Sequence, residues 1–300
     1  ISYFKKIPLV GSGVFAIMDF FQKIEPFYPR RDLSRPSMQQ RYFYKKIQQG
    51  LGRSLIENLN KESLPLLTTF FVVAYCAEYY NYKGDIYLVV CDADVSRAWA
   101  PIDPPSSRIT YLVPNKRVKE RLMLYGVREE KIYATGFPLP KENIGDDQET
   151  LKSDLKKRLA VLDPYGIYRK KYSKLIEAYL CPISEIGEAE RPLTLSFVVG
   201  GAGAQRDLGV TILSRLKNKI IDGRIRLNLV AGSRKDVLDY YVGCLKKHYL
   251  YGQKNVNIIY SENKFDYFRK FNEALRETDI LWTKPSEMSF YSGLALPIIM

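Results

Sequence analysis

Apolar residues recur along the chain with two different periods, and the two periods alternate. From Leu193 onward, short runs rich in β-branched and aromatic residues alternate with segments whose apolar residues return at every third or fourth position. The strand-like runs are LTLSFVVGG, RIRLNLVAGS, VNIIYS and DILWT, and the helix-like segments are RDLGVTILSRLKNKII, RKDVLDYYVGCLKKHYL and FDYFRKFNEALRET. Strands that alternate with such helices predict right-handed βαβ units and a parallel sheet. We therefore predict a Rossmann-like domain over residues 193–300.

The first half of the chain carries the same alternation in a less regular form. LPLLTTFFVVAYCAEYY reads as a short strand that enters a helix, and KRVKERLMLYG reads as a second helix. Further strand-like runs are DIYLVVCDAD, RITYLVPN and KIYATGFPL. We predict an N-terminal Rossmann-like domain over residues 1–140. A charged connecting segment follows over residues 141–192 and includes the helix-like ETLKSDLKKRLAVL.

Both ends of the chain look incomplete for an α/β fold of two Rossmann-like domains. A parallel sheet is not expected to begin with the turn-rich KKIPLVGSG, so we expect the first strands of the N-terminal domain to be missing. The last residues hold a strand, a Lys-Pro-Ser-Glu turn, a short helix and a second apolar strand at Pro297–Met300. We expect the C-terminal domain to be incomplete as well.

Composition narrows the class of protein. With 46% hydrophobic and 26% charged residues the chain has the balance of a folded protein, and no apolar run reaches the roughly 18 residues of a spanning helix. Four scattered cysteines without CxxC spacing and one histidine give no zinc-site pattern, so we expect no metal and no cofactor. No leader pattern opens the chain. We expect a cytoplasmic protein, with a peripheral position on the inner face of the membrane as a further candidate.

The formal net charge of +13 calls for an anionic partner. Residues 1–192 carry 30 Lys and Arg against 23 Asp and Glu, and residues 193–300 carry 16 against 10, so no basic tail explains the excess. An anionic small molecule, an anionic membrane surface and nucleic acid are the candidate partners, and a merely basic solvated surface is the alternative. Nucleic acid is disfavoured because no RNA-binding signature is present.

Two segments combine aromatic and basic residues on predicted helices. They are FAIMDFFQKIEPFYPRR and QQRYFYKKIQQG. Such surfaces can lie on an anionic bilayer, and they can equally consist of core aromatics flanked by solvated lysines. We favour the core interpretation.

Ligands of a parallel sheet bind beyond the carboxyl ends of its strands, so the loops at those ends are the candidate site. GGAGAQ follows the first strand of the C-terminal domain, where residues without a Cβ let the backbone approach a ligand and the next helix points its N–H groups at an anion. The spacing is not GxGxxG, and turn geometry alone is the alternative. The candidate ligands in this loop and in AGSRKD are Gly200, Gly201, Gly203, Gln205 and Ser233.

The turn TKPSEMS follows the fourth strand of the same domain. Lys284 supplies a positive charge, Pro285 stiffens the turn, and Ser286 can cap a helix whose first amides reach Ser289. Glu287 is acidic where a phosphate site wants positive charge, so its expected partner is a ribose diol. A first-turn carboxylate that complements the helix dipole is the alternative role for Glu287.

These motifs resemble those of glycosyltransferases of the B fold. The group contains monogalactosyldiacylglycerol synthases, processive diacylglycerol glucosyltransferases and the N-acetylglucosaminyltransferase that forms lipid II. GGAGAQ and TKPSEMS look like the family's glycine loop and its TKPGG-type turn, and Tyr111–Pro140 and VVCDAD at Val89–Asp94 are similar to stretches of its acceptor domain. The resemblance covers roughly residues 60–300 and implies two domains that face each other across a cleft.

The resemblance implies an inverting glycosyltransferase. It would move a sugar from a nucleotide diphosphate donor, UDP above all, to a lipid or cell-envelope acceptor. The chain departs from the family in lacking a glycine-rich loop after the first strand and in carrying Ser286 and Glu287 where the family has glycines. The alternatives are a nucleotide-sugar 2-epimerase of the same fold, which the single histidine disfavours, and a non-catalytic protein that binds nucleotide or nucleic acid.

Inverting transfer needs a general base on the acceptor side. Asp92 and Asp94 end a strand of the N-terminal domain and are the predicted base candidates at the cleft. Capping of a turn or pairing with Arg97 is the alternative role for these carboxylates. His248 lies at the end of a predicted helix and is expected on the surface.

Overall fold

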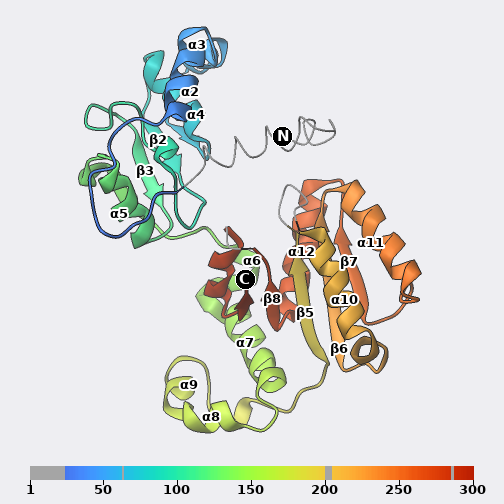
Figure 1. Ribbon diagram of the computed structural model, residues 1–300. Coiled ribbons are helices and arrows are strands. Elements are labelled where there is room, and N and C mark those ends of the chain that lie inside the picture. The colour runs from blue at the N-terminus through green and yellow to red at the C-terminus, as the bar shows by residue number, and fades with distance from the viewer. Residues whose placement is uncertain (1–23, 63, 200–204, 285–286) are drawn as a thin grey trace. The chain divides into compact units, whose positions relative to one another are not determined.

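The computed structural model describes residues 24–62, 64–199, 205–284 and 287–300. Contacts divide the chain into two compact units, Ile1–Pro138 and Leu139–Met300, here called the N-terminal and C-terminal units. Each unit contains one parallel sheet flanked by helices (Figure 1). The predicted α/β class with two Rossmann-like sheets is confirmed.

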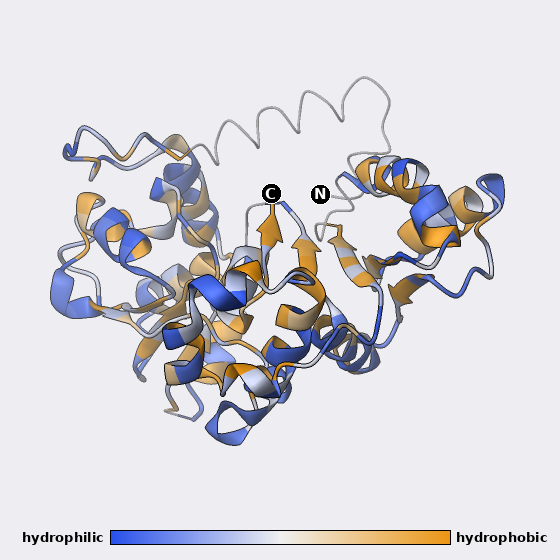
Figure 2. Cartoon of the chain, turned by 90° about the horizontal axis from the view of Figure 1, so that it is seen from below, coloured by the Kyte–Doolittle hydropathy of each residue, from blue (hydrophilic) through white to orange (hydrophobic). Residues whose placement is uncertain are grey.

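The N-terminal unit is built on a four-stranded parallel sheet in the order β1-β2-β3-β4. Each predicted strand is present and is short. Figure 2 shows the strands of both sheets in the colours of apolar residues and the helices in mixed colours, as expected when a helix buries one face. The elements are α2 (Met38–Gln48), α3 (Arg53–Leu59), β1 (Leu66–Thr68), α4 (Phe71–Tyr79), β2 (Ile86–Val89), η2 (Arg97–Trp99), β3 (Thr110–Val113), α5 (Lys116–Leu124), η3 (Glu129–Lys131) and β4 (Ile132–Ala134).

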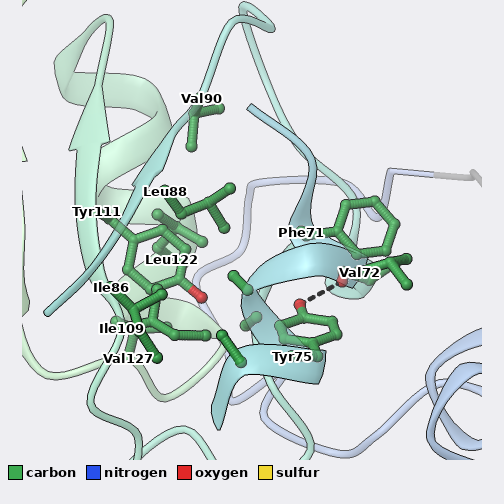
Figure 3. Close-up of a cluster of buried hydrophobic side chains, with 14 of the residues drawn as sticks. Phe71, Val72, Tyr75, Ile86, Leu88, Val90, Ile109, Tyr111, Leu122 and Val127 are labelled. Carbon is green, nitrogen blue, oxygen red and sulfur yellow. Dashed lines mark hydrogen bonds between the residues drawn. The ribbon is translucent and has the colours of Figure 1, made fainter. Parts of the chain in front are cut away.

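Helix α4 forms the centre of the core of the N-terminal unit. Six of its nine residues are buried, because its sequence FVVAYCAEY is apolar on nearly every side. Figure 3 shows its Phe71 and Tyr75 on one side of the cluster, with strand residues on the other. The Tyr75 hydroxyl donates to the carbonyl of Ala98 at 2.6 Å, and Trp99 packs against the same core.

The two aromatic and basic segments differ in outcome. The first was expected to be helical, but its described part, residues 24–31, forms no helix, and the rest lies outside the described residues. The second forms α2, in which Ile47 is buried and Phe43 packs on the core. Met38 and Tyr42 of α2 are exposed, so only part of its apolar surface belongs to the core.

The C-terminal unit holds a five-stranded sheet in the order β7-β6-β5-β8-β9, and every pair of neighbours is parallel. This order confirms the predicted βαβ series and the final apolar strand. The segment after β8 forms a 3₁₀ helix where a short helix was expected. The elements from the first strand onward are β5 (Leu193–Val198), α10 (Arg206–Ile221), β6 (Ile225–Gly232), α11 (Lys235–Lys247), β7 (Val256–Tyr260), α12 (Lys264–Glu277), β8 (Ile280–Trp282), η6 (Glu287–Leu294) and β9 (Ile298–Ile299).

The segment expected to connect the domains packs as part of the C-terminal unit. Its Arg158 is buried and donates to the backbone carbonyls of Thr278, Leu294 and Ala295 at 2.9–3.1 Å. These bonds fix the long helix of this segment to the turns that precede β8 and β9. The elements here are α6 (Lys141–Ile144), η4 (Asp146–Gln148), α7 (Glu149–Leu162), α8 (Ile167–Lys171), α9 (Ser173–Tyr179) and η5 (Ile183–Glu185).

Gly209 lets the first turn of α10 lie close to the sheet. A Cβ at this position would come within 2.7 Å of the Tyr241 hydroxyl oxygen and 2.9 Å of the Phe197 ring. Such distances are far below van der Waals contact, so a side chain there would push α10 away from β5 and α11. Gly243 of α11 provides a matched contrast, because nothing lies within 4 Å of its missing Cβ.

We predict opposite effects for alanine at the two helical glycines. Gly243→Ala should stabilise the protein by about 0.5–1 kcal/mol, since alanine loses less backbone entropy than glycine in a helix. Gly209→Ala should destabilise it by about 1–3 kcal/mol, because overpacking outweighs that gain. Urea denaturation of both variants measures the difference. Equal stabilisation by the two substitutions would show that α10 does not depend on this close approach.

Candidate functional site

The order of strands in the C-terminal unit reverses at β5. The chain passes from β5 to β6 and β7 on one side, and then crosses to β8 and β9 on the other side. At such a reversal the connections leave the carboxyl edge in opposite directions and open a crevice for a ligand. The segments that follow β5 and β8 therefore form the candidate ligand-binding site.

The turn after β8 is held by the neighbouring strand. The backbone N–H of Thr283 donates to the carbonyl of Ile299 at 2.9 Å, and Thr283 is buried. Lys284 comes next and is exposed, so its ammonium group is available to a ligand. Pro285 and Ser286 lie outside the described residues.

Helix η6 carries two more of the predicted ligands. Glu287 is its first residue and is exposed, and Ser289 is half-buried. Burial raises the pKa of Tyr291, and the nearby Glu287 carboxylate raises it further. Glu287 therefore lies at the start of a helix, near a buried hydroxyl, with its carboxylate open to solvent.

The loops after β5 and β6 lead into the amino ends of α10 and α11. Gln205 is exposed with a φ of 66° directly before α10, and Ser233 is exposed after β6. Gly200, Gly201 and Gly203 lie outside the described residues. The two helix amino ends turn unpaired N–H groups and positive dipole ends toward the carboxyl edge of the sheet.

Two arginines that the sequence analysis did not single out flank these helix ends. Arg234 donates to both oxygens of Asp236 at 3.0 and 2.8 Å, and Arg206 lies 3.7 Å from the same carboxylate. The hydrogen bonds from Arg234 hold the pKa of Asp236 below its usual value. Two guanidinium groups thus lie beside one exposed carboxylate, so these three side chains together carry a net positive charge.

A tyrosine orders one of the two guanidinium groups. The Arg206 guanidinium lies 4.6 Å from the centre of the Tyr240 ring, and the Tyr240 hydroxyl donates to Asp207 at 2.5 Å. The hydrogen bond to Asp207 raises the pKa of Tyr240 to about 12. The sequence signal for this cluster was that RD opens the helix after β5 and that SRKD directly follows β6.

In the N-terminal unit, Asp94 forms a strong ion pair. Arg121 donates to its two oxygens at 2.9 and 2.8 Å, and Arg117 adds a bond of 3.2 Å. Burial alone would raise the pKa of Asp94, but the hydrogen bonds from Arg121, the Val95 N–H and Arg117 outweigh it and lower the pKa. A carboxylate held in this way is a weak proton acceptor, and this geometry favours a structural role.

Asp92 lies three residues after the end of β2 and is half-buried. Arg97, the partner considered for these two carboxylates, instead donates to the carbonyls of Ser34, Ala100 and Pro101. The base role predicted for Asp92 stays a prediction. His248 caps the carboxyl end of α11 and lies at no strand end.

A cavity of about 700 Å³ lies at the opposite edge of the C-terminal sheet. It is bordered by α7, by the segment that leads into β5 and by the end of α12, so it faces the amino ends of the strands. Most of its charged side chains are already paired, as Asp154 is with Arg276 at 3.2 Å and Lys156 with Glu185 at 2.6 Å. Ligands of open parallel sheets bind beyond the carboxyl ends of the strands, so this cavity at the amino ends is not the candidate site.

Within residues 24–62, 64–199, 205–284 and 287–300, no three His, Cys, Asp or Glu side chains are grouped so that they could hold a metal ion. In the same ranges, no helix has both the length and the apolar character needed to cross a bilayer.

Comparison with known proteins gives likenesses of structure only. No protein-family model and no curated protein matches the chain. Among solved structures, it is similar to a UDP-GlcNAc 2-epimerase from Neisseria meningitidis bound to UDP-GlcNAc, with a TM-score of 0.49 and 12% identity over 91% of this chain and 66% of that one. It is also similar to the S. aureus MnaA–UDP co-structure, with a TM-score of 0.43 and 14% identity over 98% and 68%. The chain thus spans about two thirds of the length of these structures.

The interpretation as an inverting glycosyltransferase is corrected on this finding. One of the similar structures named above is a UDP-GlcNAc 2-epimerase, which agrees with the alternative that the sequence left open. The resemblance to the glycolipid-forming glycosyltransferases led to the wrong reaction, because glycine loops and Lys-Pro turns indicate only the fold and the edge of the sheet at which a ligand binds. They do not report the bond that is made or broken.

We predict that Asp94→Asn destabilises the N-terminal unit. At neutral pH the substitution leaves Arg121, which is 1% exposed, without its charged partner, and the expected cost is about 2–4 kcal/mol. Because the folded pKa of Asp94 is lowered, its contribution is fully present above the unfolded value near 3.9 and is lost as the pH falls through the folded pKa. The stability gap between the native chain and the variant should therefore narrow below about pH 4.

Urea denaturation between pH 3 and 7 measures this gap. Glu120→Gln on α5, the helix that carries Arg121, serves as the control. Its partners Arg30 and Lys116 are exposed, so the expected cost is below about 1 kcal/mol. A gap for Asp94→Asn that stays constant with pH would contradict the ion-pair explanation.

Proposed function

We propose that the C-terminal unit binds the nucleoside diphosphate of a nucleotide sugar, of the UDP-sugar class. The observation that supports this most directly is the gathering of positive groups at the carboxyl edge where the strand order reverses. The amino ends of α10 and α11, the guanidinium groups of Arg206 and Arg234, and the exposed Lys284 follow the three adjacent strands β6, β5 and β8. Two acidic side chains at this edge, Asp236 and Asp207, are already engaged by arginine and tyrosine.

The chemistry of a diphosphate fits this arrangement. Helix amides bind phosphate oxygens without a change in their own charge, and guanidinium groups add charge-assisted hydrogen bonds. Asp236 keeps the two guanidinium groups close together in the free protein, and an incoming phosphate competes with it for their N–H donors. The exposure of this ion pair keeps the cost of that exchange small.

The exposed carboxylate of Glu287 fits a second part of the same ligand. A carboxylate accepts two hydrogen bonds from a vicinal diol, as the acidic residue of dinucleotide sites does with a ribose. Lys284 and Glu287 are three residues apart in the sequence and both are exposed, so the pair is suited to a ligand that carries an anionic group next to a diol. A nucleoside diphosphate has both.

The first test separates the phosphate contacts from the ribose contact. Lys284→Ala should weaken the binding of both UDP and free pyrophosphate by about tenfold. Glu287→Ala should weaken UDP by roughly 1–3 kcal/mol and leave pyrophosphate unchanged, because only UDP carries the diol. Isothermal titration of both ligands provides the measurement.

Arg226→Ala is the matched control for this titration. Arg226 forms an ion pair with Glu277 at 2.5 Å that is about as exposed as the pair of Arg234 with Asp236, but it lies at the amino edge of the same sheet. It should leave both affinities unchanged. Loss of UDP affinity in this variant, or equal losses of UDP and pyrophosphate in Glu287→Ala, would contradict the proposed site.

The second test concerns the reaction, for which we propose 2-epimerisation of the bound sugar. Inversion at C2 requires the C2–H bond to break and to form again on the opposite face. UDP-GlcNAc incubated with the chain in D₂O should therefore exchange its C2 proton for deuterium, which proton NMR detects directly. Saturable UDP-GlcNAc binding without exchange would instead support the non-catalytic alternative that the sequence left open.

A further inference from the structure

A small helical lobe of the C-terminal unit presents an unusual number of large apolar side chains to solvent. The lobe, residues 164–180, contains α8 and α9; it follows α7 in the sequence and lies below it in Figure 1. Six such side chains fall within fifteen residues of its sequence. Their exposed fractions are Tyr165 87%, Ile167 70%, Tyr168 47%, Tyr172 37%, Leu175 54% and Tyr179 77%.

The lobe has its own anchor, so these side chains are not needed to hold it. Ile176 is buried in a small core with Ala160 of α7 and Cys181. Arg169 donates to the side chain of Asp163 at 3.2 Å and to its backbone carbonyl at 2.8 Å. Because the inner face is fixed in this way, the apolar outer face is a surface of the folded protein.

The same lobe is strongly basic. It carries Arg169, Lys170, Lys171 and Lys174 against one acidic residue, the exposed Glu177. Arg169 is paired with Asp163, and the three lysines are exposed. Within the described ranges of the chain, none of these three ammonium groups forms an ion pair, so the lobe presents a net positive charge.

Aromatic rings extend this basic surface. The Tyr168 and Tyr172 rings lie 4.6 Å apart between centroids, and the Lys171 ammonium group lies 5.1 Å from the centre of the Tyr172 ring. Tyrosine rings with lysine side chains alongside are typical of the boundary between lipid headgroups and acyl chains, where one end of each side chain is apolar and the other is wet.

We propose that the 164–180 lobe docks on an anionic lipid surface. Ile167 and Leu175 enter the acyl boundary, the tyrosines lie at headgroup depth, and the lysines contact lipid phosphates and carboxylates. Nucleic acid would account for the lysines and the tyrosines, but it offers nothing apolar to the two aliphatic side chains. A protein interface would account for the apolar side chains, but lysine is depleted in such interfaces.

The test uses the full chain and vesicles of phosphatidylcholine with or without about one third phosphatidylserine. The native chain should sediment with the phosphatidylserine vesicles and not with the neutral ones. The triple variant Lys170→Glu, Lys171→Glu and Lys174→Glu should lower the partition coefficient at least about a hundredfold, because each lysine near an anionic surface contributes about a factor of five. The double variant Ile167→Ser with Leu175→Ser should also lower the partition coefficient, although its net charge equals that of the native chain.

The matched control is Lys219→Glu, Lys247→Glu and Lys254→Glu, three exposed lysines elsewhere in the same unit with the same total change of charge. It should retain binding within about threefold, and circular dichroism checks that every variant is folded. Equal losses in the control and in the lysine variant would overturn the proposal in favour of a net-charge effect. Absence of vesicle binding by the native chain would also overturn the proposal. So would a native dimer that dissociates in the variant Ile167→Ser with Leu175→Ser, or binding of a single-stranded oligonucleotide that is lost in the lysine variant while vesicle binding is unchanged.

Discussion

The C-terminal unit depends most on the hydrogen bonds that the buried guanidinium group of Arg158 donates to the backbone. Arg158 is 3% exposed, and it donates to three backbone carbonyls in two turns that lie more than a hundred residues away from it in the sequence. Burial lowers the pKa of Arg158, yet guanidinium remains charged under any ordinary condition. Three carbonyl acceptors compensate the desolvated charge, and no neutral side chain could supply the same donors in the same geometry.

The position of these carbonyls connects the scaffold to the candidate site. Thr278 precedes β8, and Leu294 and Ala295 precede β9, so the guanidinium group holds both ends of the segment that contains the Lys284 turn. The same residue fixes α7, and α7 carries the 164–180 lobe. One buried cation thus holds the proposed ligand turn and the proposed lipid-binding lobe to the same sheet.

A second set of polar groups sets the register of this sheet, and all of them except the exposed Asn257 are buried. Ser196, Asn228 and Asn257 are paired across three adjacent strands, and their side chains are linked by hydrogen bonds of 3.1 and 3.2 Å. The Ser196 hydroxyl also meets the Thr278 hydroxyl at 2.6 Å. A slip of one residue between strands would leave the buried Ser196 and Asn228 without these partners, which favours one register over its neighbours.

The elements of this fold could be predicted from the sequence, because the change from helical to strand periodicity is a local signal. The apolar runs around Leu195, Leu229 and Leu281 all formed strands in the expected order. The role of Arg158 could not be predicted, since in KKRLAVL it looks like one more solvated charge and its acceptors lie more than a hundred residues away. The Arg206–Asp236 contact was hidden for the same reason, because it exists only where β5 and β6 are neighbours. The helix expected after the Lys284 turn became 3₁₀, in a stretch that ends with Ala295 at a φ of 53°.

The chain has only two tryptophans, and the fold assigns one to each unit. Trp99 packs on the core of the N-terminal unit, and Trp282 packs on the core of the C-terminal unit, with its ring 6.4 Å from that of Phe197. Each indole is therefore an intrinsic fluorophore for one sheet, so replacing either with phenylalanine leaves an emission signal from the other unit alone. Trp282 also stands two residues before Lys284, which makes its emission a direct optical probe of the turn whose ligand is in question.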